Sequence, residues 1–225
     1  MTQQFGLVQL QFLLQGAVWT LILSAAALTG GGCLGFLVAL CRVSPSRVVR
    51  TLSAVYVQLV QGTPLLVIMF TLFFGLPGLG INVTALTAAS IALIVYAGAY
   101  LGEIWRGCIQ SVPKPQWEAA ECLALTRTQR MMRVVLPQAI RIATPPTIGF
   151  AVQIVKNSSL ASVVGLVELA RAGQIINNSI FQPFVIYSVI AVAYFAMCYP
   201  LSLWGQRLEQ RSGYARRAST VVAAP

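Results

Sequence analysis

Hydrophobic positions in this sequence gather into long runs that are separated by short polar segments. No charged residue occurs before Arg42, between Arg50 and Glu103, or between Arg171 and Arg207. A helix needs about 20 apolar residues to cross about 30 Å of hydrocarbon, so these gaps can hold one or two crossings each. We therefore predict an all-α membrane protein with five membrane-spanning helices, at about residues 17–41, 51–75, 85–105, 142–164 and 184–204.

The lysine and arginine residues lie in alternate connections between the predicted spans. Apart from Lys156 and Arg171, they all lie in the first connection, in the connection over residues 106–141, or after the last span. Cytoplasmic loops of membrane proteins carry such an excess of basic residues. The pattern predicts an N-terminus outside and a C-terminus in the cytoplasm. We expect residues 1–211 to form a single membrane domain and residues 212–225 to form a cytoplasmic tail. The basic residues on the cytoplasmic side are Arg42, Arg47, Arg50, Arg106, Lys114, Arg127, Arg130, Arg133, Arg141, Arg207, Arg211, Arg216 and Arg217.

The composition supports a membrane protein and excludes several kinds of chemistry. Apolar residues make up 57% of the chain and charged residues only 9%, against about 25% charged residues in average globular proteins. The net charge of +10 does not indicate nucleic-acid binding, because the arginines lie between apolar spans. The chain has neither His nor Asp, which removes the commonest general base and most metal sites. We therefore expect no enzyme activity and no metal site.

Small residues and cysteines inside the spans are better explained by packing than by chemistry. The segment Gly30–Gly32 with Gly35 lets a neighbouring helix backbone approach closely, so we predict a helix contact there. No two cysteines form a CxxC pair, and we interpret them as packing residues. The first 41 residues lack a basic n-region, so they are interpreted as a span and not as a cleaved signal peptide. The cysteines are Cys33, Cys41, Cys108, Cys122 and Cys198.

The longest polar connection, residues 106–141, predicts a short helix on the cytoplasmic side. Pro115 suits a first helical turn, and Glu118 would then lie near the helix N-terminus, where the helix dipole favours a negative charge. Ala119 and Ala120 leave bare backbone that another surface can approach, and leucines 123 and 125 offer apolar contacts. Two interpretations remain open on physical grounds. The helix either docks into a groove of a cytoplasmic partner or lies on the lipid headgroups.

Polar residues inside the fourth predicted span indicate a special environment. Lys156 is the one cation inside a span, and a charge at the middle of the bilayer is costly. Residues 157–159 extend this polar break, and Pro145 and Pro146 should kink the same helix. One hypothesis is that Lys156 meets a substrate carboxylate or a gate. The alternative is a structural link to a second chain or to Glu168.

The third predicted span carries two further polar pairs. Glu103 and Arg106 are three residues apart at its cytoplasmic end, and we interpret them as a structural ion pair. Tyr96 and Tyr100 lie on one helix face, where they could line a path or simply pack.

Several sequence motifs together resemble one family. Glu118-Ala119-Ala120, followed by Leu136-Pro137, resembles the EAA motif of ABC importer permeases. Residues 62–66 (GTPLL) are similar to a stretch in the branch that carries polar amino acids such as histidine, glutamine and arginine. The resemblance extends over about residues 16–211. The remaining matching segments are Ala99–Tyr100, Glu103–Ile104, Arg106–Gly107, Ser111–Lys114, Lys156–Leu160 and Glu168–Leu169.

The resemblance implies a five-helix permease of the type I ABC importer fold in the inner membrane of a prokaryote. Two permease chains would pair, an ABC ATPase dimer would bind below, and an extracytoplasmic solute-binding protein would deliver a polar amino acid or a similar solute such as an opine. ATP and Mg²⁺ would bind the ATPase partner and no cofactor would bind this chain. The resemblance implies that the ATPase is contacted by Glu118, Ala119, Ala120, Leu123, Ala124 and Leu125. Our hypothesis for the substrate path comprises Gln58, Gln61, Thr63, Tyr96, Tyr100, Lys156, Ser158 and Ser159.

The chain departs from the family pattern at three positions. The family usually has Gly where this chain has Ala124, which would be strained in a turn that requires a positive φ. The family often has Glu and Arg where this chain has Gln58 and Gln61. The chain contains no Walker A sequence, so we expect ATP hydrolysis to occur in a partner. A secondary carrier or channel is the alternative, although it would favour acidic residues inside the spans.

Overall fold

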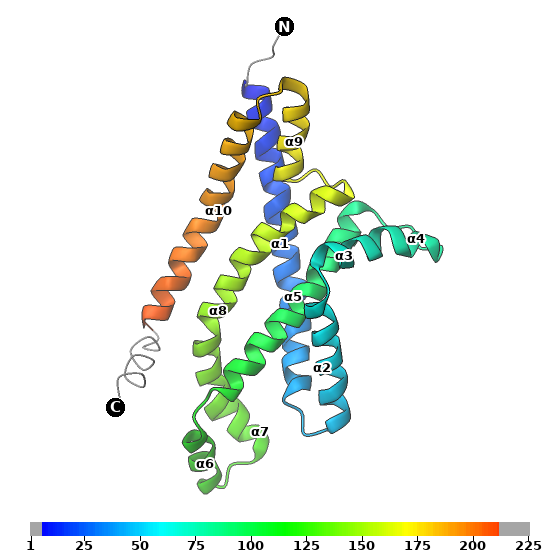
Figure 1. The fold of residues 1–225 in the computed structure, drawn as a ribbon. Helices are drawn as coiled ribbons and strands as arrows, with labels where there is room; N and C mark the ends of the chain where they lie inside the picture. The colour runs from blue at the N-terminus through cyan, green and yellow to red at the C-terminus, as the bar shows by residue number, and fades with distance from the viewer. Residues whose placement is uncertain (1–5, 212–225) are drawn as a thin grey trace, which may run out of the picture.

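The computed structural model describes residues 6–211, which form helices joined by short connections (Figure 1). No strand occurs in this described part, so the predicted all-helical fold is confirmed. The predicted tail, residues 212–225, lies outside the described residues. The elements are α1 (Leu7–Arg42), α2 (Arg47–Gly62), α3 (Leu65–Phe70), η1 (Thr71–Gly75), α4 (Leu76–Gly78), α5 (Ala85–Gln110), α6 (Lys114–Cys122), α7 (Arg127–Gln129), η2 (Arg130–Val135), α8 (Leu136–Asn157), η3 (Ser158–Val164), α9 (Leu169–Ile180) and α10 (Pro183–Arg211).

Four continuous helical stretches in the described residues are long and apolar enough to cross a membrane. They are Leu7–Arg42, Ala85–Gln110, Arg127–Val164 and Pro183–Gln210. Four of the five predicted spans lie inside these stretches. Pro145 and Pro146 lie inside α8, which stays helical through both residues. The hydroxyls of Thr144 and Thr147 donate hydrogen bonds to the carbonyl oxygens of Ile140 and Ala143 near this point.

The second predicted span differs from the expectation of one straight helix. The chain bends by 101° between Arg47–Gly62 and Leu65–Gly78, so this segment counts as a fifth span only if the two parts are taken together. The cause is local. Pro64 has no N–H to donate, and it restricts Thr63 to the extended backbone that the structure shows, with φ −109° and ψ 130°. Beyond the bend, α3 contributes Leu65 and Met69 to the core, and α4 lies at the far end of the segment, away from the bundle (Figure 1).

The contact between α1 and α5 depends on glycines in both helices. A Cβ atom added to Gly35 would lie 2.9 Å from Cβ of Leu101, and one added to Gly102 would lie 2.6 Å from Cγ1 of Val38. Real side chains cannot approach so closely, so the two backbones meet only because both positions lack a side chain. The predicted packing role of the small residues in the first span is confirmed.

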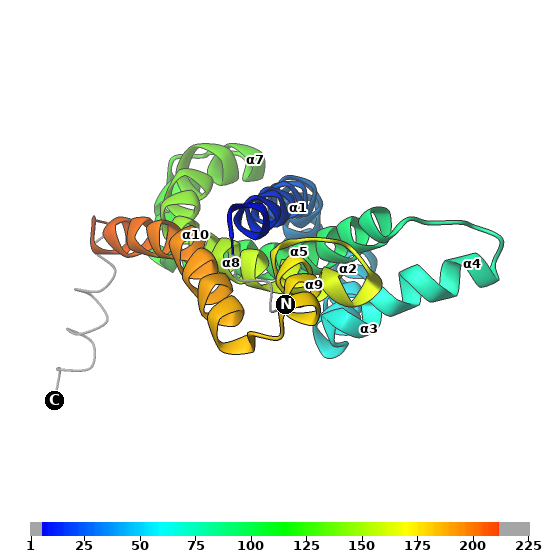
Figure 2. The same ribbon diagram turned by 90° about the horizontal axis from the view of Figure 1, so that it is seen from above.

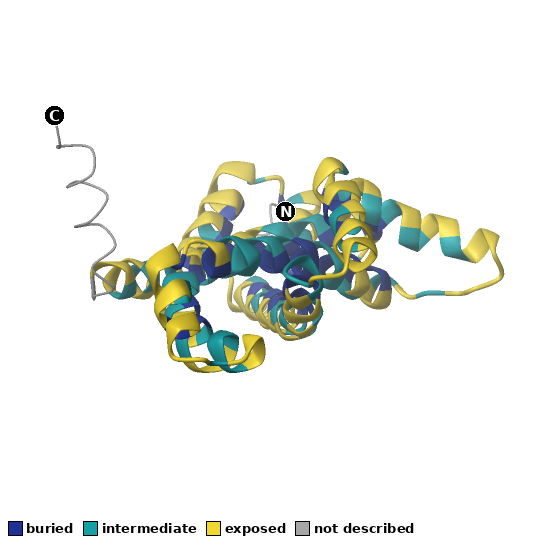
Figure 3. Ribbon diagram, turned by 90° about the horizontal axis from the view of Figure 1, so that it is seen from below, coloured by how far each residue is buried: buried dark blue, intermediate teal, exposed yellow. Residues whose placement is uncertain are grey.

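Apolar residues of α1, α3, α5, α8 and η3 form the main core. Its fully buried members include Leu23, Met69, Leu93 and Ile154. A second apolar cluster joins α1 to α9 and α10 through residues such as Leu13, Ile176 and Ile186. Seen from above, α9 lies between the starts of α1 and α10 (Figure 2). In the view from below, buried residues gather along the middle and exposed residues cover the outer helices (Figure 3).

The buried carboxylate of Glu168 connects three helices at the end of the bundle that carries the N-terminus. Glu168 is 0% exposed and caps α9 by accepting hydrogen bonds from the backbone N–H groups of Ala170 and Arg171. It also accepts from the hydroxyls of Thr20 on α1, at 3.3 Å, and Tyr194 on α10, at 2.8 Å. These four donors satisfy a group that would otherwise be costly to bury. Glu168 therefore fixes α9 against both neighbouring helices.

Candidate functional site

The predicted cytoplasmic helix exists as α6, at the same end of the molecule as the turn between α1 and α2 and opposite α9 (Figure 1). A small apolar cluster holds this end together and packs against Trp117 of α6. Its buried members are Ile109, Val112, Val135 and Ala139. A nine-residue helix is too short to be stable alone in water, so this packing is what stabilises α6.

The local sequence determines where α6 begins. Pro113 has an extended backbone conformation (φ −54°, ψ 137°), the helix starts at Lys114, and Pro115 lies in the first turn as predicted. Glu118 is then the fifth residue of α6, and no acidic residue lies in the first turn. The prediction that Glu118 lies near the helix N-terminus is therefore wrong by about one turn, and the helix dipole has little effect on it.

One face of α6 is exposed and the other packs against the chain. Ala120 is only 2% exposed, and its carbonyl oxygen accepts a hydrogen bond from the N–H of Leu125. Glu118 and Ala119 are exposed, and so is Leu123, with 73% of its surface accessible. Leu125 is partly buried. The predicted contact residues thus divide into an outward surface formed by Glu118, Ala119 and Leu123, and a supporting side that includes Ala120.

Polar contacts tie α6 to the segment that continues into α8. The carboxylate of Glu121 lies 2.9 Å from a guanidinium nitrogen of Arg130 in η2. The side-chain amide of Gln138 in α8 donates to the side-chain oxygen of Gln116 at 3.3 Å. Because η2 and α8 form one continuous helical stretch, α6 is connected directly to a membrane-crossing element. A displacement of α6 can therefore pass to α8.

The turn after α6 contains the strain that the sequence predicted. Ala124 has φ 53°, a left-handed conformation that L-residues with a side chain disfavour. The N–H of Ala124 donates to the carbonyl of Glu121 and the N–H of Leu125 donates to that of Ala120. This is the arrangement in which helices commonly end with glycine. The alanine is therefore kept in an unfavourable conformation by the hydrogen bonds of the turn.

The surroundings of Lys156 form a second candidate site, at the end of α8. Lys156 is exposed on the isolated chain, and its side-chain ammonium makes neither a hydrogen bond nor an ion pair among the described residues. Glu168 is bonded to Thr20 and Tyr194 instead. The predicted alternative of a Lys156–Glu168 link is therefore wrong. One turn away on α8, the side-chain amide of Gln153 donates to the side-chain oxygen of Asn157 at 3.2 Å.

Three aromatic rings lie beside this polar group, where α5 meets α8. The ring centroids of Tyr96 and Tyr100 are 4.4 Å apart, and Tyr100 stacks on Phe150 at 5.6 Å with an interplanar angle of 13°. The sequence left two interpretations of these tyrosines open: they could line a transport path, or they could simply pack. The structure shows that both tyrosines pack against the main core and against Phe150 of α8.

The other predicted path residues are dispersed. Gln58 and Gln61 are exposed on α2, on the far side of the bend from α3. The hydroxyl of Thr63 donates to the carbonyl of Leu59. Ser158 is fully buried and donates to Val155, so it does not lie on an open surface. Ser159 donates to the carbonyl of Lys156.

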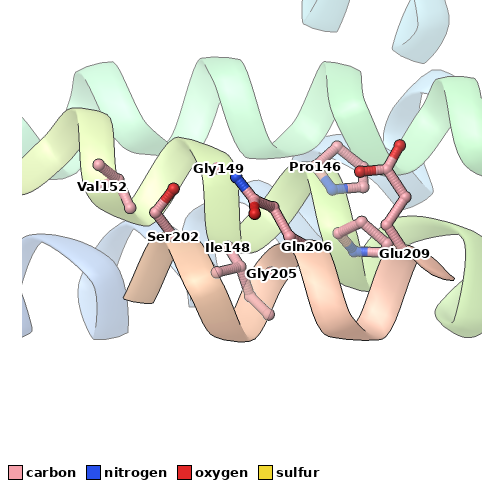
Figure 4. Close-up of a pocket in the computed structure, with 9 residues that line it drawn as sticks. Pro146, Ile148, Gly149, Val152, Ser202, Gly205, Gln206 and Glu209 are labelled. Carbon is pink, nitrogen blue, oxygen red and sulfur yellow. The ribbon is translucent and has the colours of Figure 1, made fainter. Parts of the chain in front are cut away.

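A groove between α8 and α10 lies further along α8, toward the end that carries α6. Figure 4 shows Gly149 and Pro146 of α8 facing Ser202, Gln206 and Glu209 of α10 across it. Sequence reasoning did not identify this groove. Gly149 and Gly205 both line the groove. They are 56 positions apart, and no pattern in the sequence indicates that they lie close together. Its remaining lining residues are Pro145, Ile148 and Val152.

An ion-pair network joins α1 to α5 near the α6 end. Glu103 accepts from Nε of Arg106 at 2.9 Å, as predicted for a structural pair, and Arg106 also contacts Gln110. Sequence reasoning missed the third member, Arg42, whose guanidinium lies 3.3 Å from Glu103. Because Arg42 precedes Glu103 by 61 positions, only the α1–α5 packing brings the two together.

Among residues 6–211, His, Cys, Asp and Glu form no group of three or more that could hold a metal ion.

Comparisons with known proteins agree with the fold and with the motifs. Residues 31–214 match the family described as binding-protein-dependent transport system inner membrane component. A probable amino-acid ABC transporter permease of Bacillus subtilis is 36% identical over 200 residues, covering 89% of this chain and 88% of that protein. The L-cystine transport system permease of the same species is 37% identical over 211 residues, covering 92% and 90%. The glutamine transport system permease of Escherichia coli is 33% identical over 201 residues, covering 88% and 92%.

Solved structures confirm the fold that the resemblance implied. A chain from the crystal structure of an amino acid ABC transporter with histidines superposes with a TM-score of 0.86 at 31% identity, covering 93% of this chain and all of that one. A chain of a methionine ABC transporter in an inward-facing conformation superposes with a TM-score of 0.77 at 19% identity, which supports the fold alone. The family match covers well over half of the sequence. The chain therefore belongs to the family of inner membrane components of binding-protein-dependent transport systems.

Proposed function

We propose that this chain is the permease subunit of an ABC importer that carries a polar amino acid or a similar small polar solute. Relatives named as amino-acid, glutamine and L-cystine permeases, each matching about nine-tenths of the chain, support the substrate class. The chain forms the membrane path and a separate ABC ATPase dimer, which binds ATP and Mg²⁺, supplies the energy. A second permease chain and an extracytoplasmic solute-binding protein complete the complex in the inner membrane.

The single observation that carries the mechanism is the connection of α6 to α8. Glu118, Ala119 and Leu123 present an exposed surface, and the Glu121–Arg130 pair fixes that surface to the helical stretch that crosses the membrane. A movement of the ATPase against α6 then displaces α8 as a rigid element. This arrangement favours docking of α6 in a partner over a helix that merely lies on the headgroups.

We infer that the end of the bundle with α6 faces the cytoplasm and that the end with α9 faces outward. The turn between α1 and α2, with Arg42 and Arg47, lies at the same end as the basic residues around α6 (Figure 1). An excess of Lys and Arg on one side supports a cytoplasmic location of that side. The N-terminus is then outside and the C-terminus inside.

Replacing Ala119 by Arg tests the docking role of α6. Arg has a good helix propensity, so α6 should still form, but a long side chain would stand on the proposed contact surface. ATP-driven uptake in vesicles that contain the complete importer should fall at least about tenfold, as for a disrupted interface. The matched control is Arg47→Ala, an exposed residue at the same end outside this surface, which should leave uptake unchanged. Unchanged uptake by Ala119→Arg would remove α6 from the ATPase contact.

The alternative of a carrier or channel makes a different prediction. The purified chain in liposomes without an ATPase should move no solute under an ion gradient, because Glu103, which lies in the spanning helix α5, is already paired with Arg42 and Arg106. Gradient-driven uptake by this chain alone would support the alternative and overturn the proposal.

A further inference from the structure

We propose that the groove between α8 and α10 binds a membrane phospholipid whose headgroup carries a primary amine, as in phosphatidylethanolamine. Glu209 and the polar groups beside it hold the ammonium group, and Arg141 holds the phosphate. The first carbons of the acyl chains lie along the apolar wall that contains Ile148 and Val152. The lipid belongs to the leaflet at the α6 end of the bundle, and its binding does not depend on which solute is transported.

The groove has the size of a small-molecule site. Its volume is about 360 Å³, and pockets for small ligands measure about 300–1,000 Å³. Gly149 of α8 and Gly205 of α10 line opposite walls (Figure 4). Gly149 is exposed, and a Cβ atom added to it would meet nothing within 4 Å. The space beside Gly149 is therefore open to a ligand.

The groove lies at the depth where lipid headgroups meet the acyl chains. The 29 residues of α10 rise about 44 Å, which is about the thickness of a bilayer with its headgroups. Glu209 lies in the last turn of this helix, and Ser202 lies about 10 Å closer to the middle of the membrane. Figure 4 shows Glu209 and Pro146 toward one end of the groove and Ser202 and Val152 toward the other. The groove thus runs from the headgroup region into the hydrocarbon.

The polar groups of the groove match a primary ammonium group. The side chains of Ser202, Gln206 and Glu209 line it and form neither a hydrogen bond nor an ion pair among the described residues. On the facing wall, Pro145 and Pro146 have no N–H, so the carbonyl oxygens one turn earlier in α8 lose their usual donors. The groove therefore offers a negative charge and several acceptors. A primary ammonium group carries one positive charge and three N–H donors, whereas the quaternary ammonium of choline has no N–H.

Arg141 is placed to bind the phosphate of the same headgroup. It lies four residues before Pro145, so it continues the same side of α8 toward the α6 end, and it is exposed. Arg141 forms no ion pair within the described part of the chain. Arginine binds phosphate through two parallel hydrogen bonds. A carboxylate and a guanidinium at one end of the groove therefore complement the two charges of a zwitterionic headgroup.

Lipid binding to the assembled permease–ATPase complex, purified in detergent, tests the inference. The probes are palmitoyl-oleoyl phospholipids with ethanolamine, choline or glycerol headgroups, and native mass spectrometry counts the lipids that the complex retains. We expect the ethanolamine lipid to bind at least about tenfold more tightly than the other two, as for one hydrogen bond to a charged group. Glu209→Gln should remove this preference, and Glu209→Asp, which keeps the charge, should retain most of it.

A second variant tests the groove itself. Gly149→Leu fills the groove without removing its polar groups and should abolish tight binding of the ethanolamine lipid. Leucine is a good helix former and the added Cβ meets no neighbouring atom, so α8 should still form. Gly32→Leu is the matched control, because Gly32 of α1 has equally open surroundings outside the groove. It should bind the ethanolamine lipid as the native complex does.

The outcomes separate this inference from the proposed function. Equal affinities of the native complex for the three lipids, tighter binding of the choline or glycerol lipid, or an unchanged preference in Glu209→Gln would overturn the inference. If Gly149→Leu separates the permease chains and leaves the lipid preference unchanged, a second chain covers the groove and the inference is wrong. ATP-driven uptake by the complete importer is measured separately, so it would still support the permease function in each of these cases.

Discussion

The hydroxyl of Tyr194 lies 2.8 Å from Oε2 of Glu168, so that a side chain of α10 donates to the residue that caps α9. The two residues are 26 positions apart, and the bond joins α10 to α9 at the end of the bundle where Thr20 of α1 binds the same carboxylate. Hydrogen bonds to a buried charged group are among the stronger ones in proteins. This contact is therefore important for the position of α9.

Replacing Tyr194 by Phe should destabilise the protein by about 1.5–3 kcal/mol, because the buried carboxylate loses one of its donors. Thermal unfolding in detergent measures the change. Tyr187→Phe is the matched control, since Tyr187 lies on the same helix and is 48% exposed; its unfolding temperature should not change. Equal unfolding temperatures for Tyr194→Phe and the native chain would show that the bond does not hold α9.

Replacing Ala124 by Gly should stabilise the turn after α6 by up to about 1 kcal/mol, because glycine adopts a φ of 53° without steric cost. Unfolding temperature is again the measurement. Ala119→Gly, in the same short helix but in a helical conformation, should do the opposite and cost about 1 kcal/mol. Destabilisation by both substitutions would contradict the left-handed conformation at Ala124.

Replacing Gly35 by Ala should destabilise the α1–α5 contact by about 1–3 kcal/mol, because its Cβ would collide with Leu101 and the backbone of Gly102. Gly32→Ala is the control in the same helix, where an added Cβ meets nothing within 4 Å. It should be neutral or stabilising through its better helix propensity. If the two variants unfold at the same temperature, the close approach of the helices at Gly35 is wrong.

A double-mutant cycle can measure the interaction energy between Arg42 and Glu103. Arg42→Gln and Glu103→Gln should each lower stability, and the double variant should lose less than the sum, with a coupling energy of about 1 kcal/mol. The half-buried position of both side chains places this value at the upper end of the range for exposed pairs. Additive losses would mean that the two residues contribute independently.

The sequence predicted the membrane-spanning regions because length and hydropathy alone determine which segments can cross a bilayer. It did not predict the bend at Thr63–Pro64, although Pro64 is visible in the sequence. The apolar run continues on both sides of that proline, so hydropathy alone reads it as one span. Hydropathy also does not show whether a proline interrupts a helix. A kink was expected at Pro145 and Pro146, which lie inside the continuous helix α8, and no break was expected at Pro64.

The candidate site was predictable where its residues are close in sequence. Glu118, Ala119 and Leu123 belong to one helix, and Ala124 was expected to be strained because the family pattern has glycine there. Contacts between distant positions were not predictable. An acidic residue in a loop, such as Glu168, is ordinarily exposed, and only the packing of α9 against α1, 148 positions away in sequence, buries it beside Thr20. A single sequence contains no information that pairs such positions.

The 101° bend after Gly62 has a consequence for how the protein enters the bilayer. The 16 residues of α2 rise about 24 Å, which is less than the thickness of the hydrocarbon layer. This helix is therefore too short to act as an independent stop-transfer segment. Its insertion depth is determined by α1 and α5, between which it packs, so we expect integration of the second segment to follow the association of those two helices.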